Sequence, residues 1–327
     1  MLTHSLSHAS RAAGSDVEWR EPALWQLVGR TPLIPVLVPG GGGAPAELLL
    51  KAEWLNPGGS VKDRPAREIL RAGIASGALP GRRLLDASSG NTAVAYAMLG
   101  AAAGIGVTVC VPGNASAERR SMIKVYGAEL IETDPLEGSD GAIRRARDLA
   151  VAEADRYWYA DQYDNPANPQ GHYLTTGPEI WADTAGTVTH LVAGVGTSGT
   201  MMGAGRFLKE KRPEIRLIAV EPDGSFHGLE GLKHMATAIV PAIYHPSAVD
   251  ETVFVATEEA ESRVRDLASR DGLFVGWSTG AAVVAAEEVL ARETKDDRAP
   301  PPVVVVIAPD GGTRYLSEDR RLFGGGA

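Results

Sequence analysis

One lysine in the sequence stands in a turn that could make it a nucleophile. Residues 56–64 read Asn-Pro-Gly-Gly-Ser-Val-Lys-Asp-Arg, and an apolar run at Leu48–Leu50 precedes them. Asn-Pro followed by Gly-Gly favours a turn, and we expect Ser60 to cap a helix whose first turn holds Lys62. The positive end of a helix dipole disfavours a cation, and a neutral lysine can attack an aldehyde to form a Schiff base. An ordinary exposed lysine also fits this stretch taken alone.

A second polar stretch, Ser-Ser-Gly-Asn-Thr at residues 88–92, follows a short predicted strand and opens a predicted helix. It offers two hydroxyls, an amide and free backbone N–H groups, which together can bind a carboxylate. A simple helix N-cap would explain one serine or the asparagine, but neither the second hydroxyl nor the glycine. Both interpretations stay open at this point.

A glycine-rich stretch at residues 194–200, Gly-Val-Gly-Thr-Ser-Gly-Thr, joins a predicted strand to a predicted helix. It contains G-x-G-x-x-G, and Glu221 follows the next strand about twenty residues later, as a dinucleotide site requires. The hydroxyls of Thr197, Ser198 and Thr200 instead favour a terminal phosphate, which has many acceptor oxygens. Glycines that only allow close packing of helix and strand are the third interpretation.

A fourth stretch, Gly-Trp-Ser-Thr-Gly-Ala at residues 276–281, also joins a strand to a helix and alone would be an ordinary turn with a serine cap. The Cys, His and acidic residues show no metal-ligand spacing, and neither H-E-x-x-H nor G-x-S-x-G occurs. The sequence therefore predicts no metal site and does not support a hydrolase.

The composition of the 327 residues is typical of a globular protein with ordinary cores. A net charge of −9 and the absence of a basic stripe argue against nucleic acid as a partner. Cys110 is the single cysteine and lies in an apolar run, so we expect no internal disulfide and a reducing, cytoplasmic setting. Residues 1–21 lack the apolar core of a signal peptide and are expected to form a flexible tail, and no apolar run has membrane-spanning length.

Predicted strands rich in Val, Ile and Leu alternate with predicted helices along the chain. Strands are expected at 31–38, 47–51, 84–85, 107–111, 128–132, 157–160, 190–193, 216–220 and 303–307, and helices at 65–75, 92–103, 116–126, 140–154 and near Met201, Glu258 and Ala281. This rhythm predicts an α/β fold of two domains, each with a mostly parallel sheet flanked by helices. The Asn-Pro-Ala-Asn-Pro cluster at 165–169 divides them into residues 22–165 and 166–327, with part of 22–53 packing on the second domain.

Taken together, these stretches resemble the cysteine synthases. The matching residues are 56–64, 88–92, 162–169, 172–179, 196–200 and 276–281, in the family's order and spacing within Trp25–Leu316. The family consists of pyridoxal-phosphate enzymes that replace a β-substituent, with the fold of tryptophan synthase β and cystathionine β-synthase. Ser88 stands where threonine is more usual, Ser198 where glycine or threonine is common, and Trp277 where isoleucine or a small residue is usual, which puts the substrate rather than the cofactor in question.

The resemblance implies a role for each motif in holding pyridoxal 5′-phosphate. Lys62 forms the Schiff base, and Asn91 hydrogen-bonds the ring hydroxyl oxygen. The phosphate is held by Gly196, Thr197, Ser198, Gly199 and Thr200. Ser278 meets the pyridine nitrogen, and a neutral hydroxyl there makes the ring a weaker electron sink, which favours prompt loss of a β leaving group.

The resemblance also implies the reaction. The carboxylate of an O-activated L-serine is held by Ser88, Ser89, Thr92 and Gln162. Lys62 removes the Cα proton, the β-substituent leaves, and sulfide or sulfur from a carrier protein adds to give L-cysteine. Closure of the segment with the 88–92 loop would exclude water. A homodimer is expected from the resemblance alone.

The leaving group remains open between acetate and phosphate. Gly231 matches the family's glycine beside the active-site mouth, and a cation occupies about the place of Lys233 in the members that accept O-phosphoserine. Lys233 is therefore the candidate phosphate reader, although a solvated lysine fits as well and His227 or His234 could serve instead.

Three rival functions remain. A cystathionine β-synthase core would use homocysteine on the same scaffold. A serine or threonine dehydratase shares the Ser-Ser-Gly-Asn loop but usually continues with histidine, so Thr92 argues for replacement. A nicotinamide-dependent oxidoreductase is the rival suggested by the glycine pattern at 194–199.

Overall fold

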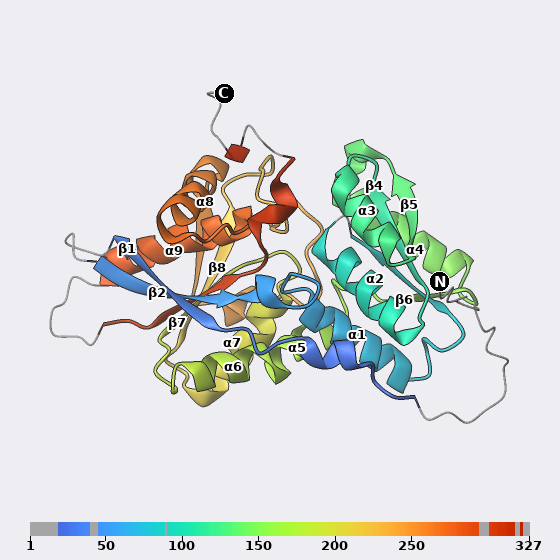
Figure 1. The fold of residues 1–327 in the computed structure, drawn as a ribbon, viewed down its shortest axis with the longest axis horizontal. Helices are drawn as coiled ribbons and strands as arrows, with labels where there is room; N and C mark the ends of the chain where they lie inside the picture. Colours follow the sequence, from blue (N-terminus) through green and yellow to red (C-terminus); the bar gives the residue numbers. More distant parts are fainter. Residues whose placement is uncertain (1–18, 40–44, 89, 294–300, 318–320, 323–327) are drawn as a thin grey trace, which may run out of the picture.

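The chain is built on two β-sheets that lie beside each other, seen left and right in Figure 1. The computed structural model describes residues 19–39, 45–88, 90–293, 301–317 and 321–322. Nearly all of the tail predicted at residues 1–21, and Ser89, therefore lie outside the described residues. In the described part of the chain, no helix has the length and apolar character needed to cross a membrane.

The larger sheet combines an early hairpin with strands from the second half of the chain. Its order is β1 (Leu33–Pro39), β2 (Pro45–Ala52), β10 (Val304–Ala308), β7 (His190–Gly194), β8 (Arg216–Pro222) and β9 (Glu251–Val255). Only the β1–β2 pair is antiparallel, and β2 pairs with β10 in parallel, so the early hairpin joins a sheet otherwise built from residues 190–308.

Helices cover both faces of this sheet, which explains why its strands are largely apolar. Alternate residues point to opposite faces. Val192 and Ile218 pack against the helices α8 (Thr257–Asp271) and α9 (Trp277–Glu293), while Leu191 and Leu217 pack against α6 (Thr176–Asp183) and α7 (Gly199–Lys211).

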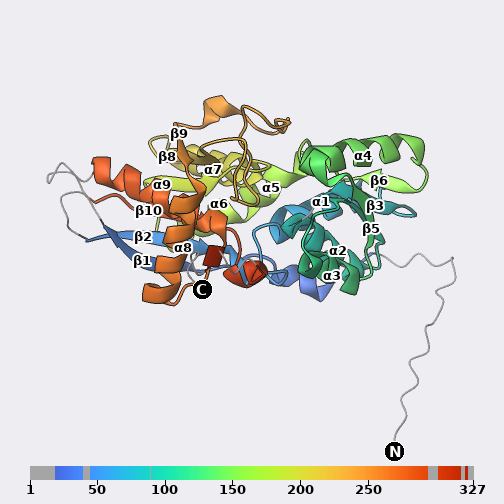
Figure 2. The same cartoon turned by 90° about the horizontal axis from the view of Figure 1, so that it is seen from above.

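The smaller sheet is wholly parallel. Its order is β5 (Glu129–Thr133), β4 (Val107–Pro112), β3 (Arg83–Ala87) and β6 (Tyr157–Tyr159). In Figure 2, α4 (Gly138–Ala152) lies on one side of it, and α2 (Asn91–Ala103) and α3 (Ala117–Val125) lie on the other. The helix α5 (Ala167–Leu174) contacts α7, which packs on the larger sheet, and α1 (Asp63–Ala75), which packs on the smaller sheet. It therefore connects the two halves of the structure, each half being one sheet with its helices.

The α/β class with two mostly parallel, helix-covered sheets is confirmed. Among the strands and α-helices of the described residues, β9, α5 and α6 were not predicted. The start of the lysine helix was also predicted wrongly. Helix α1 begins at Asp63, and Lys62 itself occupies the N-cap position with helical backbone angles. Ser60 is not the cap, because its Oγ accepts a hydrogen bond from the backbone N–H of Lys62 at 3.2 Å, inside the preceding turn.

A buried network of charges fixes α1 to the larger sheet. Arg64 donates from Nε to Glu53, just after β2, at 2.6 Å and from Nη1 to Glu179 on α6 at 2.7 Å. Lys51 Nζ lies 3.0 Å from the same Glu179 carboxylate. Burial alone would raise the pKa of Glu179, but its hydrogen bonds and attraction to Arg64 and Lys51 lower the pKa to about 2. Each carboxylate is therefore charged and paired at neutral pH.

Replacing Arg64 tests this network. We expect Arg64→Leu to lower the free energy of unfolding by about 3–5 kcal/mol, since it leaves Glu53 buried without its cation. Arg71→Leu on the same helix should cost less than about 1 kcal/mol, because Arg71 is 36% exposed and pairs at the surface. Urea denaturation of both variants measures the difference.

The pH dependence follows from the lowered pKa of Glu179. A carboxylate whose folded pKa is depressed stabilises the fold above its ordinary value of 4.5 and loses that contribution as the pH falls towards about 2. The deficit of Arg64→Leu relative to wild type should therefore shrink in acid. Equal losses in the two arginine variants at neutral pH would contradict the role given to Arg64.

Candidate active site

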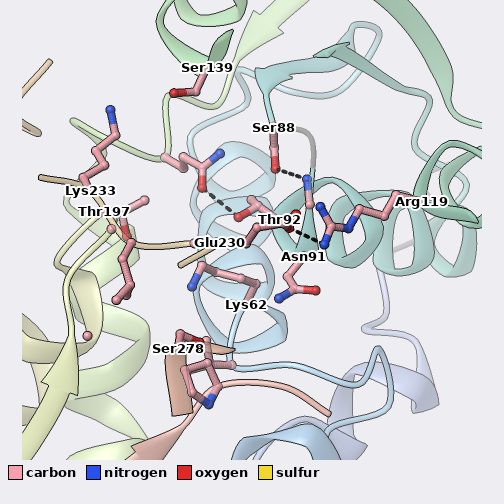
Figure 3. Close-up of a pocket in the computed structure, with 18 of the residues that line it drawn as sticks. Lys62, Ser88, Asn91, Thr92, Arg119, Ser139, Thr197, Glu230, Lys233 and Ser278 are labelled. Carbon is pink, nitrogen blue, oxygen red and sulfur yellow. Dashed lines mark hydrogen bonds and ion pairs between the residues drawn. The ribbon is translucent and has the colours of Figure 1, made fainter. Parts of the chain in front are cut away.

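A cavity of about 650 Å³ is lined by residues from both halves of the chain and is shown in Figure 3. Every predicted site residue that the structure describes lines it. These residues are Lys62, Ser88, Asn91, Thr92, Gln162, Gly196, Thr197, Ser198, Gly199, Thr200, Gly231, Lys233 and Ser278. Ser89 lies outside the described residues. The fold thus brings to one place motifs that are more than 200 positions apart in the sequence.

Lys62 enters the cavity from the start of α1. Burial lowers the pKa of its amine below the ordinary value, and the negative charges of Asp310 and Glu53 only partly offset this effect. The sequence predicted loss of the proton from the helix dipole, and the structure adds burial of the amine as a cause of the lowered pKa. A neutral amine is the form that can act as a nucleophile or a base.

The glycine-rich loop between β7 and α7 is shaped by close backbone approaches. A Cβ on Gly196 would lie 2.0 Å from the backbone oxygen of Gly231, and one on Gly199 would lie 1.9 Å from Asn168 Oδ1. Ser198 adopts a left-handed conformation with φ of 69°, which is uncommon for a non-glycine residue. These constraints turn the loop towards the N-terminus of α7, a 13-residue helix.

The donors of this loop fit a phosphate. Ser198 Oγ is buried and has no hydrogen-bond partner, so it needs a ligand oxygen to satisfy it. Thr197 Oγ1 accepts a bond from Asn168 Nδ2 at 3.1 Å, which leaves its O–H free to donate. Backbone N–H groups at a helix N-terminus add further donors and a favourable dipole.

The 88–92 loop is coupled to Gln162 by a chain of hydrogen bonds. Ser88 Oγ accepts from the backbone N–H groups of Gly90 at 3.2 Å and Ala93 at 3.3 Å. Thr92 Oγ1 donates to Gln162 Oε1 at 2.7 Å, and Gln162 Nε2 donates to the Ala87 carbonyl at 2.8 Å. These bonds hold the ends of β3 and β6 in one arrangement beside the cavity.

Two cations stand on opposite sides of the cavity in Figure 3. Lys233 Nζ lies 3.4 Å from Asp140 Oδ1 on α4 and 3.2 Å from the carbonyl of Ile239. Arg119 on α3 pairs with Glu230, two residues before Leu232 in the loop that carries Lys233. Both ion pairs cross between the halves, and any anion in the cavity must compete with a carboxylate for either cation.

Arg119, Glu230 and Asp310 were missed by the sequence analysis. Arg119 stands between Glu118 and Arg120, and Glu230 stands alone between two Gly-Leu pairs in a predicted loop, so nothing local distinguishes either from a solvated residue. Asp310 follows the apolar strand β10 and precedes two glycines, which is a usable signal for a functional loop at a strand end.

Trp277, which stands where the cysteine synthases usually have isoleucine or a small residue, packs in the core and does not line the cavity. Trp277 is buried, with its ring centroid 5.6 Å from that of Tyr315, and it is absent from the cavity lining, whereas the next residue, Ser278, lines it.

Glu221 does not take the position that a dinucleotide site needs. It is buried, and its Oε2 accepts a hydrogen bond from the backbone N–H of Met235 at 3.0 Å. A ribose hydroxyl would need this carboxylate free beside the glycine-rich loop. The oxidoreductase interpretation is therefore not favoured.

Comparison with known proteins places the chain in a family. The family model described as "Pyridoxal-phosphate dependent enzyme" matches residues 24–310. The chain belongs to this family. It is 47% identical to "Cysteine synthase" of Aquifex aeolicus over 295 residues, which is 89% of this chain and 90% of that protein. It is 41% identical to "Cysteine synthase B" of Salmonella typhimurium over 269 residues, 80% of this chain and 86% of that protein.

A solved structure agrees in fold. The O-acetyl serine sulfhydrylase isoform 3 from Entamoeba histolytica superposes with a TM-score of 0.84 at 31% identity, covering 100% of this chain and 96% of the other. As a pyridoxal-phosphate enzyme, the chain needs a phosphate site and a lysine in one cavity. The unpartnered Ser198 hydroxyl, the N-terminus of α7 and the buried amine of Lys62 meet that requirement.

The close approach at Gly196 predicts a sensitive position. We expect Gly196→Ala to weaken pyridoxal phosphate binding roughly tenfold to a hundredfold, because the new methyl group pushes the loop away from Gly231 at a cost of about 1–3 kcal/mol. Cofactor absorbance after dialysis measures the retention.

Gly224→Ala is the matched control, since a Cβ there would meet nothing within 4 Å. It should keep its cofactor. Full retention by Gly196→Ala would contradict the described shape of the 196–200 loop.

Proposed function

We propose that this chain synthesises L-cysteine by replacing the β-substituent of an O-activated L-serine with sulfur. The observation that carries the proposal is the position of Lys62, whose buried amine lies in one cavity with the 88–92 loop and the 196–200 loop. The relatives named cysteine synthase support the reaction class.

In this proposal, the cofactor is held at four places by residues of this chain. Residues 196–200 hold its phosphate, Asn91 its ring hydroxyl oxygen, Ser278 its ring nitrogen and Lys62 its aldehyde. When bound, pyridoxal phosphate supplies a carbonyl for the substrate amine and a conjugated ring that takes up electron density from Cα. A neutral hydroxyl at the ring nitrogen, rather than a carboxylate, favours loss of the β-substituent.

Lys62 then has a second role as the base. The amine of Lys62, when it is not bonded to the cofactor, would remove the Cα proton of the substrate, and burial, which lowers its pKa, increases the fraction of this amine that is neutral. Ser88, Ser89, Thr92 and Gln162 orient the substrate carboxylate. Thr92 and Gln162 are already held in place by the hydrogen bond between them, so they do not have to be reoriented when the substrate binds.

The proposal also covers the oligomeric state, the compartment and the source of sulfur. The protein acts as a cytoplasmic homodimer, and its sulfur comes from sulfide or from a carrier protein. Residues 22–165 and 166–327 form two domains, except that part of residues 22–53 packs with the second one. The part with the 88–92 loop closes over the substrate to exclude water.

The first test is Lys62→Ala. Turnover of O-acetyl-L-serine with sulfide should fall by roughly a thousandfold or more, because one amine both anchors the cofactor and moves the proton. Circular dichroism should show the fold intact. Lys124→Ala, an exposed lysine on α3, is the control and should keep normal turnover. Turnover of Lys62→Ala within tenfold of wild type would refute the assignment.

The second test concerns the donor. Lys233→Ala should lower kcat/KM for O-phospho-L-serine roughly tenfold to a hundredfold, the size of one charge-assisted hydrogen bond, and leave O-acetyl-L-serine nearly unchanged. Steady-state kinetics on both donors measure the contrast.

Asp140→Ala shows whether Lys233 recognises the phosphate of the donor or only joins the two halves through its ion pair with Asp140. It breaks the same ion pair between the halves but leaves the cation of Lys233 in place. It should therefore preserve or improve kcat/KM for O-phospho-L-serine. Equal losses in both variants on both donors would show that Lys233 only bridges the halves.

A further inference from the structure

Asp310 lies just beyond the end of β10. The backbone of Asp310 and of its neighbour Pro309 is hydrogen-bonded to two stretches beside the cavity, residues 56–64 and 276–281. Asp310 forms an antiparallel bridge with Ser60, and the adjacent Pro309 accepts a hydrogen bond from the N–H of Val61 at 2.8 Å. The carbonyl of Asp310 accepts from the N–H of Gly276 at 3.0 Å. The segment therefore joins the turn before Lys62 to the turn before Ser278.

The side chain of Asp310 reaches a third motif. The residue is only 1% exposed, and its Oδ2 accepts hydrogen bonds from Asn91 Nδ2 at 2.7 Å and from the hydroxyl of Tyr315 at 2.8 Å. Its Oδ1 is buried without a partner. A Cβ on Gly276 would lie 2.0 Å from that oxygen, so the carboxylate is packed directly against the 276–281 turn.

This contact determines which end of the Asn91 amide faces Asp310. An ionised carboxylate only accepts hydrogen bonds, so it must face the NH₂ group and not the amide oxygen. One N–H of Asn91 is then committed to Asp310, and the side chain is held in a single orientation. The second N–H of the same nitrogen remains to serve a ligand in the cavity that Asn91 lines.

We propose that Asp310 is a positioning residue for the cofactor: its carboxylate orients the Asn91 amide to donate to the ring hydroxyl oxygen while its backbone holds the Lys62 and Ser278 turns at one point. The inference rests on the proposed role of Asn91. It adds a buried carboxylate that does not itself line the cavity and acts through a residue that does.

Binding to the full-length chain freed of its cofactor tests the proposal without turnover. Pyridoxine 5′-phosphate has the ring hydroxyl but no aldehyde, so its affinity is independent of the chemistry of Lys62. Its 3-deoxy analogue lacks the ring hydroxyl. Fluorescence titration of both compounds is carried out on wild type, Asp310→Ala, Asn91→Ala and the double variant.

Asp310→Ala and Asn91→Ala should each weaken pyridoxine 5′-phosphate by roughly tenfold to a hundredfold. The double variant should be no weaker than Asn91→Ala alone, because Asp310 acts through Asn91. None of the variants should change affinity for the 3-deoxy analogue by more than about twofold.

Asp310→Asn is the conservative variant and also covers the case in which Asp310→Ala does not fold. Its amide oxygen can still accept from Asn91 and Tyr315, so it should lose only roughly fivefold in affinity for pyridoxine 5′-phosphate. A structural role would instead weaken both compounds equally.

Three results would overturn the inference. Wild-type affinity in Asp310→Ala, or equal losses for the two compounds in either Asp310 variant, would show that Asp310 does not position Asn91 and would leave the proposed reaction intact. Failure of the wild-type chain to bind either compound would overturn the cofactor site together with the inference.

Discussion

The placement of Lys62 depends on the buried ion pairs of the Arg64 guanidinium. Arg64 lies two residues after Lys62 and is bonded to carboxylates from two other elements, Glu53 and Glu179. A buried charge without its partners is strongly unfavourable, so these ion pairs fix the position of α1 against the larger sheet. The amine of Lys62 is consequently delivered to the same place between the two halves.

The rest of the site follows from the direction of the parallel strands. The 88–92 loop follows β3, the 196–200 loop follows β7, and Asp310 follows β10. Ligands in open α/β sheets bind at the carboxyl ends of the strands, where loops and helix N-termini present their donors. Two such sheets placed side by side supply loops from both of their carboxyl edges to one cavity, and the proposed function assigns the phosphate to one edge and the substrate carboxylate to the other.

The sequence predicted every strand of the two sheets except β9, because buried parallel strands are largely apolar runs. It did not predict α5 and α6, since Pro169, Gly171 and Gly177 interrupt them. Packing explains two of these breaks: a Cβ on Gly171 would lie 3.0 Å from the Arg64 carbonyl, and one on Gly177 would lie 2.7 Å from Phe207. Tertiary contact thus overrides helix propensity there.

The motifs of the site could be predicted for a different reason. Hydroxyls, glycines and Lys62 cluster within short stretches, so local spacing already indicates their chemistry. The position of Asp310 after a strand indicates a functional loop, but its partner could not be predicted, because the contact with Asn91 spans 219 positions and exists only in the folded chain. The same holds for Arg119 and Glu230, which meet across the two halves.

The central claim is that Lys62 and the 196–200 loop together hold pyridoxal phosphate. Reduction of the purified protein with borohydride, followed by digestion and mass spectrometry, tests it most directly. The account predicts a phosphopyridoxyl group on the peptide that contains Lys62, with loss of the visible absorbance of the Schiff base and of cysteine synthesis. A phosphopyridoxyl group on another lysine, or an unmodified Lys62 in protein that still carries the cofactor, would contradict it.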